Sequence, residues 1–123
     1  MTHILVVEDH AANRKLVRDL LRLDGYQVLE ASSADAGIAC ARAKRPELII
    51  MDIQLPGMDG LAAIRILRAD PATQAIPIIA VTAYAMQGDE QRILAAGCER
   101  YIAKPIQYRE FQAIVRGVLG GTR

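Results

Sequence analysis

The sequence predicts an α/β protein whose doubly wound parallel sheet is covered by helices on both faces. Short apolar runs alternate with amphipathic stretches five times along the 123 residues. Such strict alternation is typical of parallel strands joined by right-handed helical crossovers. The apolar runs lack in-out alternation, as expected for strands buried on both faces. Since the length suits one domain, we expect residues 1–123 to form a single domain.

The first strand and helix are predicted from a change of period early in the chain. Ile4–Val7 is a short apolar run followed by acids, which indicates a strand and the loop after it. Beyond His10, apolar residues recur at helical spacing with charged residues opposite them. The expected buried stripe is Leu16, Val17, Leu20 and Leu21. Gly25 is expected to end this helix as a C-terminal cap.

The second strand and helix follow directly. Tyr26–Glu30 is the strand candidate. Ser33 or Ser32 can cap the next helix, because a serine hydroxyl accepts a hydrogen bond from an early backbone N–H group. We expect this helix to run to about Lys44 and to stop before Pro46.

The third unit begins with the apolar run Leu48–Met51, which ends at Asp52. Asp59 is expected to cap a helix over Gly60–Ala69, whose apolar residues recur at helical spacing. Pro71 then closes this helix. An Asp-Gly pair between alternating strands would predict a hairpin, but here a helical stripe follows, which favours a helix start.

The last two units complete the pattern. Pro77–Val81 is the fourth strand, and a helix over Asp89–Ala96 is stopped by Gly97. Arg100–Ala103 is a short fifth strand, and the final helix ends at Gly120–Gly121. The apolar stripe of that helix is expected on Phe111, Ile114, Val115, Val118 and Leu119.

Composition excludes several classes of protein. The net charge is +1 and no basic block occurs, so nothing indicates direct binding to nucleic acid. No apolar run approaches the roughly 20 residues of a membrane span, and the N-terminus lacks a signal peptide pattern. Cys40 and Cys98 are isolated, so we expect reduced and largely buried thiols in a cytoplasmic protein.

Four polar side chains follow predicted strands, and their positions indicate a functional site. Asp9, Asp52, Thr82 and Lys104 come after the first, third, fourth and fifth strands respectively. Parallel strands end at one edge of the sheet, which is where such sheets bind ligands. We therefore expect these four side chains to gather there.

Glu8, Asp9 and Asp52 would bring carboxylates together at that edge. Two charges about 4 Å apart repel by about 4 kcal/mol at an effective dielectric of 20, so such a cluster must bind a cation or protonate. Hard oxygen ligands with room for water favour Mg²⁺. Asp52 is then a candidate nucleophile, with Lys104 to neutralise a phosphoryl group and Thr82 to hydrogen-bond to it.

These residues resemble the motifs of the response-regulator receiver family, whose fold is that of CheY-like proteins. The resemblance runs from Ile4 to about Leu119. The matching motifs are Glu8–Asp9, Met51–Gly60, Val81–Ala83 and Lys104–Pro105. The resemblance implies a flavodoxin-like (βα)₅ sheet with strand order 2-1-3-4-5.

The resemblance also implies a two-component response regulator that receives a phosphoryl group on Asp52 with bound Mg²⁺. The implied metal ligands are Asp9, Asp52 and the backbone carbonyl of Gln54, with Glu8 acting through water. Lys104, Thr82 and the Ala83 N–H group are implied to hold the phosphoryl group. Thr82 and Tyr101 are the implied switch pair, and Lys104–Pro105 is the implied cis peptide bond.

The implied partners are a histidine kinase or a histidine phosphotransfer protein as donor and a protein target downstream. No membrane or direct nucleic-acid contact is expected, and the protein is a monomer or a phosphorylation-dependent dimer. The implied output face comprises the fourth helix, fifth strand and fifth helix, with Arg92, Arg100, Glu110 and Arg116. Arg14 and Lys15 are candidates for docking the donor. Gln54 and Tyr84 are expected to tune the lifetime of the phosphorylated form.

Three alternative functions compete with this interpretation. An aspartate-nucleophile phosphatase of the haloacid-dehalogenase type would carry an acid two residues after the nucleophile, where Gln54 stands. A nucleotide- or flavin-binding module would need a glycine- or hydroxyl-rich loop, whereas acids follow the first strand. A receiver belonging to a hybrid kinase or larger regulator is the third. We expect no enzyme activity beyond self-phosphorylation and slow self-dephosphorylation, and a solvent-facing His10.

Overall fold

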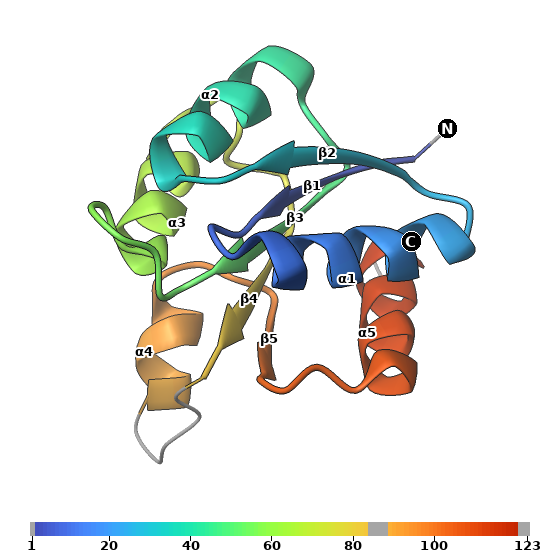
Figure 1. Cartoon of the computed structure of the whole chain (residues 1–123). Helices are drawn as coiled ribbons and strands as arrows, with labels where there is room; N and C mark the ends of the chain where they lie inside the picture. Colours follow the sequence, from blue (N-terminus) through green and yellow to red (C-terminus); the bar gives the residue numbers. More distant parts are fainter. Residues whose placement is uncertain (1, 84–88, 121–123) are drawn as a thin grey trace.

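A parallel sheet of five strands organises the molecule (Figure 1). The computed structural model describes residues 2–83 and 89–120. The strands are β1 (His3–Val7), β2 (Gln27–Ala31), β3 (Leu48–Asp52), β4 (Ile78–Thr82) and β5 (Arg100–Ala103). Their order is β2-β1-β3-β4-β5, and every neighbouring pair is parallel. The predicted fold class and strand order are confirmed.

Helices cover both faces of the sheet, as Figure 1 shows. They are α1 (Ala11–Leu23), α2 (Ala34–Lys44), α3 (Gly60–Ala69), α4 (Asp89–Ala95) and α5 (Tyr108–Gly120). One core lies between the sheet and α2, α3 and α4, and the other lies between the sheet and α1 and α5. Because each central strand contributes to both cores, β1, β3 and β4 are apolar along almost their whole length.

Two helix starts are capped by the side chains that the sequence indicated. The Ser33 hydroxyl accepts a hydrogen bond from Ala36 N at 3.1 Å, and Asp59 Oδ1 accepts one from Ala62 N at 2.8 Å. Each bond satisfies a backbone donor that has no partner inside the helix. These caps set where α2 and α3 begin, and the start of α3 lies beside the end of β3 because Gly60 N donates to Ile53 O.

Three details differ from the sequence-based expectation. Leu16 is 48% exposed, because it lies about 100° around the helix from buried Val17. The helix α2 ends with Arg45 in a left-handed conformation, φ 47°, ahead of Pro46. Strands β2 and β4 begin one residue later than predicted, since pairing with neighbouring strands decides their ends.

Candidate functional site

The carboxyl edge of the sheet gathers the polar side chains singled out in the sequence. Glu8 and Asp9 follow β1, and Lys104 follows β5. Asp52 and Thr82 are the last residues of β3 and β4 rather than the first residues of the loops. Since β3 lies between β1 and β4, Asp52 is at the centre of this edge.

Three carboxylates meet there. Glu8, Asp9 and Asp52 each offer an oxygen, and these oxygens lie within 4.8 Å of one another. Asp52 is only 3% exposed and Glu8 only 5%, whereas Asp9 is exposed to solvent. Hard carboxylate oxygens with one open side suit a magnesium ion that keeps several waters. The cluster could therefore hold such an ion.

Lys104 supplies a positive charge to the cluster. Its Nζ donates to Asp52 Oδ2 at 3.1 Å and to Glu8 Oε1 at 3.2 Å. Burial lowers the pKa of Lys104, but the hydrogen bonds and attraction to Asp52 and Glu8 outweigh it and raise the pKa above the ordinary 10.5. One cation faces three acids. The net negative charge that remains again favours a divalent cation.

Gln54 connects Asp52 with the end of β4. Its backbone N donates to Asp52 Oδ1 at 3.0 Å. Its side-chain Nε2 donates to Thr82 Oγ1 at 3.0 Å, and its Oε1 accepts from Ala83 N at 3.0 Å. Sequence reasoning assigned Gln54 a backbone role and a position beside the phosphoryl group, but it missed this side-chain bridge. No sequence signal reveals it, because the bridge depends on how β3 and β4 align.

Gly60 packs against the backbone that carries Asp52. A Cβ atom at position 60 would lie 2.3 Å from the Asp52 carbonyl oxygen and 2.6 Å from Ile53 Cα. Real Cβ atoms essentially never approach backbone so closely, so only glycine fits at the start of α3. The Asp59–Gly60 pair therefore combines a helix cap with a close contact that sets the position of Asp52.

Tyr101, the predicted switch residue, is half-buried on β5. Interaction with the Glu90 side chain of α4, together with burial, raises the pKa of Tyr101. The ring packs against the core under α2, α3 and α4. The Lys104–Pro105 peptide bond beyond β5 is cis. Tyr84 lies outside the described residues.

A family model for the response regulator receiver domain matches residues 4–116, nearly the whole chain. The chain belongs to the response regulator receiver domain family. It is therefore a receiver domain of two-component signalling, and receivers act as signalling modules rather than as conventional enzymes. The resemblance noted in the sequence is confirmed.

Relatives of known name support the same assignment. The chain is 44% identical to the polar-differentiation response regulator DivK of Brucella anthropi over 117 residues, which cover 95% of both proteins. DivK of Brucella abortus matches with the same identity and coverage. In the sequence, the runs Met51–Pro56, Thr82–Met86 and Gly88–Glu90 resemble DivK.

Solved receiver structures share the fold. One is the receiver domain of a sensor histidine kinase from Pseudomonas aeruginosa, with a magnesium ion coordinated in its active site cleft. It is 38% identical with a TM-score of 0.89, covering 97% of this chain and 98% of that one. The chemotaxis protein CheY4 of Vibrio cholerae is 25% identical with a TM-score of 0.90, covering 96% of this chain and 98% of that one.

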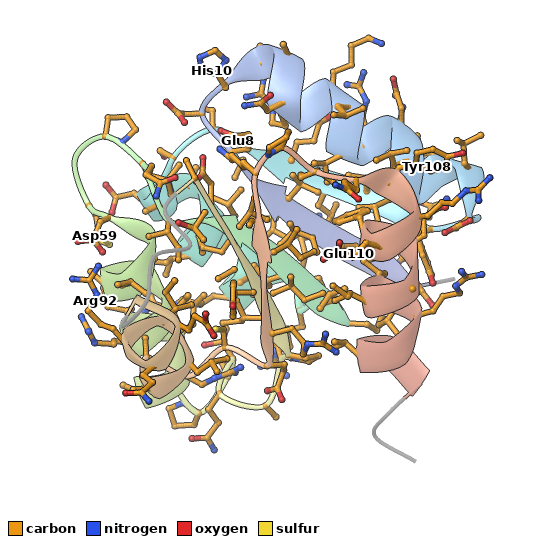
Figure 2. All side chains as sticks on the ribbon, turned by 90° about the horizontal axis from the view of Figure 1, so that it is seen from below. Glu8, His10, Asp59, Arg92, Tyr108 and Glu110 are labelled. Carbon is orange, nitrogen blue, oxygen red and sulfur yellow. The ribbon has the colours of Figure 1, made fainter. Side chains whose placement is uncertain are left out.

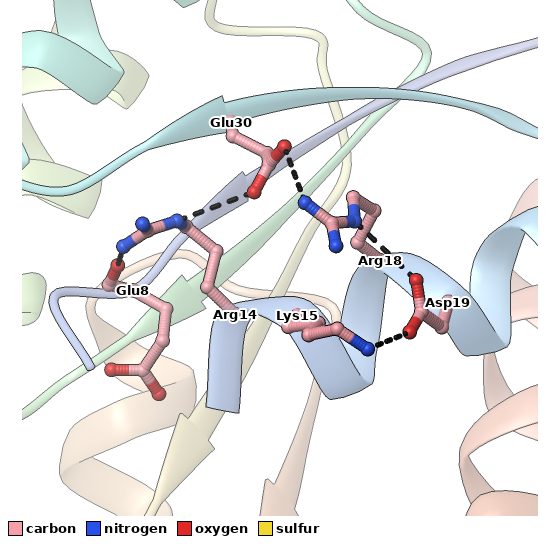
Figure 3. Close-up of polar contacts among 6 residues, drawn as sticks. All are labelled: Glu8, Arg14, Lys15, Arg18, Asp19 and Glu30. Carbon is pink, nitrogen blue, oxygen red and sulfur yellow. Dashed lines mark hydrogen bonds and ion pairs between the residues drawn. The ribbon is translucent and has the colours of Figure 1, made fainter. Parts of the chain in front are cut away.

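Three basic residues on α1 of this receiver, Arg14, Lys15 and Arg18, pair with acids, as Figure 3 shows. Arg14 donates from Nη1 to the Glu8 carbonyl oxygen at 2.9 Å and from Nε to Glu30 at 3.3 Å. Lys15 pairs with Asp19 at 3.0 Å and its side chain is 68% exposed. Of the two docking candidates, Arg14 thus braces the loop that carries Glu8, and Lys15 points into solvent.

The remaining candidates lie on the surface of the receiver. His10 is exposed at the start of α1 (Figure 2), as expected for a loop histidine, and its backbone N donates to the Glu8 carboxylate. Arg92, Arg100, Glu110 and Arg116 are all exposed, on α4, β5 and α5, and Arg116 also lines a hollow with Tyr26 at the other end of the sheet. Of the two cysteines, Cys98 is buried and Cys40 only half-buried. Within the described residues, no helix has the length and apolar character needed to cross a bilayer.

Proposed function

We propose that Asp52 is the phosphoacceptor of this receiver and that phosphorylation changes its affinity for a protein partner. The burial of Asp52 supports this most strongly. Burying a carboxylate that is 3% exposed among two other acids costs free energy unless cations offset its charge. Lys104 offsets part of that charge, and a bound Mg²⁺ would offset the rest.

The proposed magnesium ligands are Asp9, Asp52 and the backbone carbonyl of Gln54, with Glu8 acting through a bound water. Lys104 occupies one oxygen each of Glu8 and Asp52 and leaves Asp9 for the ion. When bound, Mg²⁺ would neutralise charge between the carboxylates and the phosphoryl oxygens.

In the proposed transfer, an oxygen of Asp52 attacks the phosphorus of a phosphohistidine donor. The phosphorus–nitrogen bond breaks as the new phosphorus–oxygen bond forms, and the donor nitrogen keeps the electron pair. If the second ring nitrogen of the donor histidine carries a proton before transfer, the imidazole that remains after transfer is neutral. Lys104, Thr82 and the Ala83 N–H group then hold the phosphoryl oxygens, since donors aimed at developing charge lower the barrier.

The proposed signal runs from Thr82 to the outer face of β5. Thr82 turns toward the phosphoryl group, and Tyr101 changes rotamer beside α4. The influence of Glu90 on the pKa of Tyr101 indicates that the two side chains interact, which would couple the sheet to that helix. The partner is proposed to dock on α4, β5 and α5, where Arg92, Arg100 and Glu110 are exposed, or a second copy pairs there after phosphorylation.

The proposed donor is a histidine kinase or a histidine phosphotransfer protein that docks near the first turn of α1, in the cytoplasm. Lys15 is 68% exposed there and is the better contact candidate, because Arg14 is engaged with Glu8 and Glu30. Reversing the charge at Lys15 should slow transfer from a protein donor but not from a small phosphodonor. Equal slowing with both donors would remove docking as the reason.

Residues 1–123 are proposed to act as one receiver domain whose chemistry is confined to its own aspartate. It takes up a phosphoryl group and loses it slowly to water. Gln54 borders Asp52 and is expected to change the phosphorylated lifetime when substituted. A phosphatase of the haloacid-dehalogenase type would instead turn over small phosphoesters many times.

The test is phosphorylation by acetyl phosphate with Mg²⁺, followed by intact mass. The wild-type protein should gain one phosphoryl group, and EDTA or Asp52→Asn should abolish the gain. Asp9→Asn should raise the Mg²⁺ concentration needed by at least about tenfold, since one direct ligand is lost. A gain that survives in Asp52→Asn would show that another residue is the acceptor.

A further inference from the structure

The Gln54 side chain bonds to the Thr82 hydroxyl and to the Ala83 N–H group at the end of β4. Its Nε2 lies 3.0 Å from Thr82 Oγ1 and its Oε1 lies 3.0 Å from Ala83 N. Thr82 is 1% exposed and Gln54 is half-buried, so the bond to Thr82 is partly sheltered from water, whereas the bond to Ala83 lies at the surface. We call this two-bond bridge the Gln54 clasp.

The orientation of the clasp follows from chemistry alone. A backbone N–H group can only donate, so the amide atom facing Ala83 must be the carbonyl oxygen. The amide nitrogen is then the atom that faces Thr82, and it makes the hydroxyl oxygen an acceptor. The clasp therefore uses Ala83 as a donor and Thr82 as an acceptor.

A phosphoryl group on Asp52 would need the same two groups differently. Phosphoryl oxygens accept hydrogen bonds, so Ala83 must donate to phosphate instead of to Gln54, and Thr82 must turn its hydroxyl proton toward phosphate. Gln54 N is anchored on Asp52 Oδ1, so its backbone can stay while its side chain swings away. Because the Ala83 N–H group carries a single proton, the Gln54 amide and the phosphoryl group compete for it, whereas the Thr82 hydroxyl can accept from one partner and donate to another.

We propose that the Gln54 amide is an internal substitute for the phosphoryl group, which holds Thr82 and Ala83 in their unphosphorylated arrangement until phosphorylation displaces it. This inference rests on the proposed function and deepens it. It differs from shielding the acyl phosphate against water, which concerns only the phosphorylated form. Opening the clasp costs hydrogen bonds, so it opposes activation when no phosphoryl group is present.

Two substitutions separate hydrogen bonding from bulk. Gln54→Met keeps a side chain of similar length without the amide, and Gln54→Ala removes both length and amide. Both should fold, because Gln54 is half-buried and lies in a loop after β3. Gln74→Met is the matched control, since Gln74 is exposed in the loop before β4.

The test is titration of each purified protein with beryllofluoride, a phosphoryl mimic, in the presence of Mg²⁺, read from backbone amide resonances. Gln54→Met and Gln54→Ala should bind about three- to tenfold tighter than wild type, because net hydrogen bonds of this kind no longer have to be broken. Gln74→Met should match wild type. Wild-type affinity in Gln54→Met would overturn the inference.

A second readout needs neither metal nor phosphoryl mimic. In the ligand-free protein, the Ala83 amide should exchange its hydrogen at least about threefold faster in Gln54→Met than in wild type. Unchanged exchange would overturn the clasp even if affinities shifted. If wild type fails to bind beryllofluoride, the proposed function fails and the inference falls with it. If wild type binds and Gln54→Met behaves identically, the inference alone fails.

Discussion

Two charged clusters of this receiver differ in their balance of acidic and basic side chains. At the carboxyl edge of the sheet, one cation, Lys104, bonds to the two buried acids Glu8 and Asp52. Beside α1, Arg14 and Arg18 share Glu30 at 3.3 Å each, and Arg18 and Lys15 share Asp19, so three cations meet two acids (Figure 3). The first cluster has excess negative charge, and the second has excess positive charge.

Burial decides what each excess can do. The Asp52 side chain is 3% exposed, whereas that of Glu30 is 30% exposed. Water solvates the excess positive charge around Glu30 at little cost in free energy, so those exposed ion pairs contribute little to stability. Surplus charge around Asp52 is shielded poorly and must be met by a cation or a proton. The comparison teaches that position, rather than residue type, separates a reactive cluster from a solvated one.

The largest expected effect comes from moving the backbone beneath the buried cluster. Gly60→Ala would place a methyl group 2.3 Å from the Asp52 carbonyl oxygen, and a backbone atom cannot yield. We expect a loss of about 3 kcal/mol in the free energy of unfolding, measured with urea, and weaker magnesium binding.

The control for this substitution is Gly117→Ala in α5, where a new Cβ meets nothing within 4 Å. Alanine favours a helix interior over glycine by about 0.8–1 kcal/mol, so this variant should gain stability. If Gly60→Ala were as stable as wild type, Asp52 would not depend on that close contact.

The second-largest effect is expected when the cation of the buried cluster is removed. Lys104→Met leaves Glu8 and Asp52 without their positive partner. We expect a loss of about 2 kcal/mol at neutral pH without Mg²⁺, below the roughly 3–5 kcal/mol of a fully buried pair because the Lys104 side chain is 22% exposed. Lys15→Met, which removes a lysine 68% exposed, should cost under about 0.5 kcal/mol.

The stability difference between wild type and Lys104→Met is expected to depend on pH. Folding raises the pKa of Lys104, so the stability that it contributes is complete below the ordinary value of 10.5. That contribution is lost as the pH rises through the higher folded-state pKa. The gap between wild type and Lys104→Met in urea unfolding should therefore stay constant from pH 7 to about 10 and narrow only above 10.5. Narrowing between pH 7 and 9 would contradict this assignment.

The smallest effect is expected in the exposed cluster. Glu30→Gln removes the acid shared by Arg14 and Arg18, and should cost about 0.5 kcal/mol at low salt. About 1 M salt should erase the difference, since screening then acts within about 3 Å. Beryllofluoride affinity should stay within twofold of wild type. A larger change would show that Arg14, through the Glu8 carbonyl, couples the two clusters.

Much of the fold was predictable because strands and helix starts depend on short stretches of neighbouring residues. Buried strands appear as apolar runs, and the caps Ser33 and Asp59 precede helical stripes. Leu16 was assigned to the buried stripe of α1 although it is 48% exposed, because periodicity alone does not say how wide a face the sheet covers. The left-handed Arg45 was not predicted either, since only Pro46 signals the end of α2.

The candidate site was predictable only in part. The sequence by itself determined that Asp9, Asp52, Thr82 and Lys104 lie at one edge, because parallel strands share one direction. It could not determine which atoms bond there, since partners come from strands distant in the chain.

Tertiary structure decided those bonds. The register of β3 on β4 sets Asp52 opposite Val81. Gln54, two residues after Asp52, therefore lies beside Thr82 and Ala83, which follow Val81. The contact of Gly60 with the Asp52 backbone likewise requires α3 to fold back on β3. Chain direction is a property of sequence order, whereas register and close packing arise only when separate segments meet.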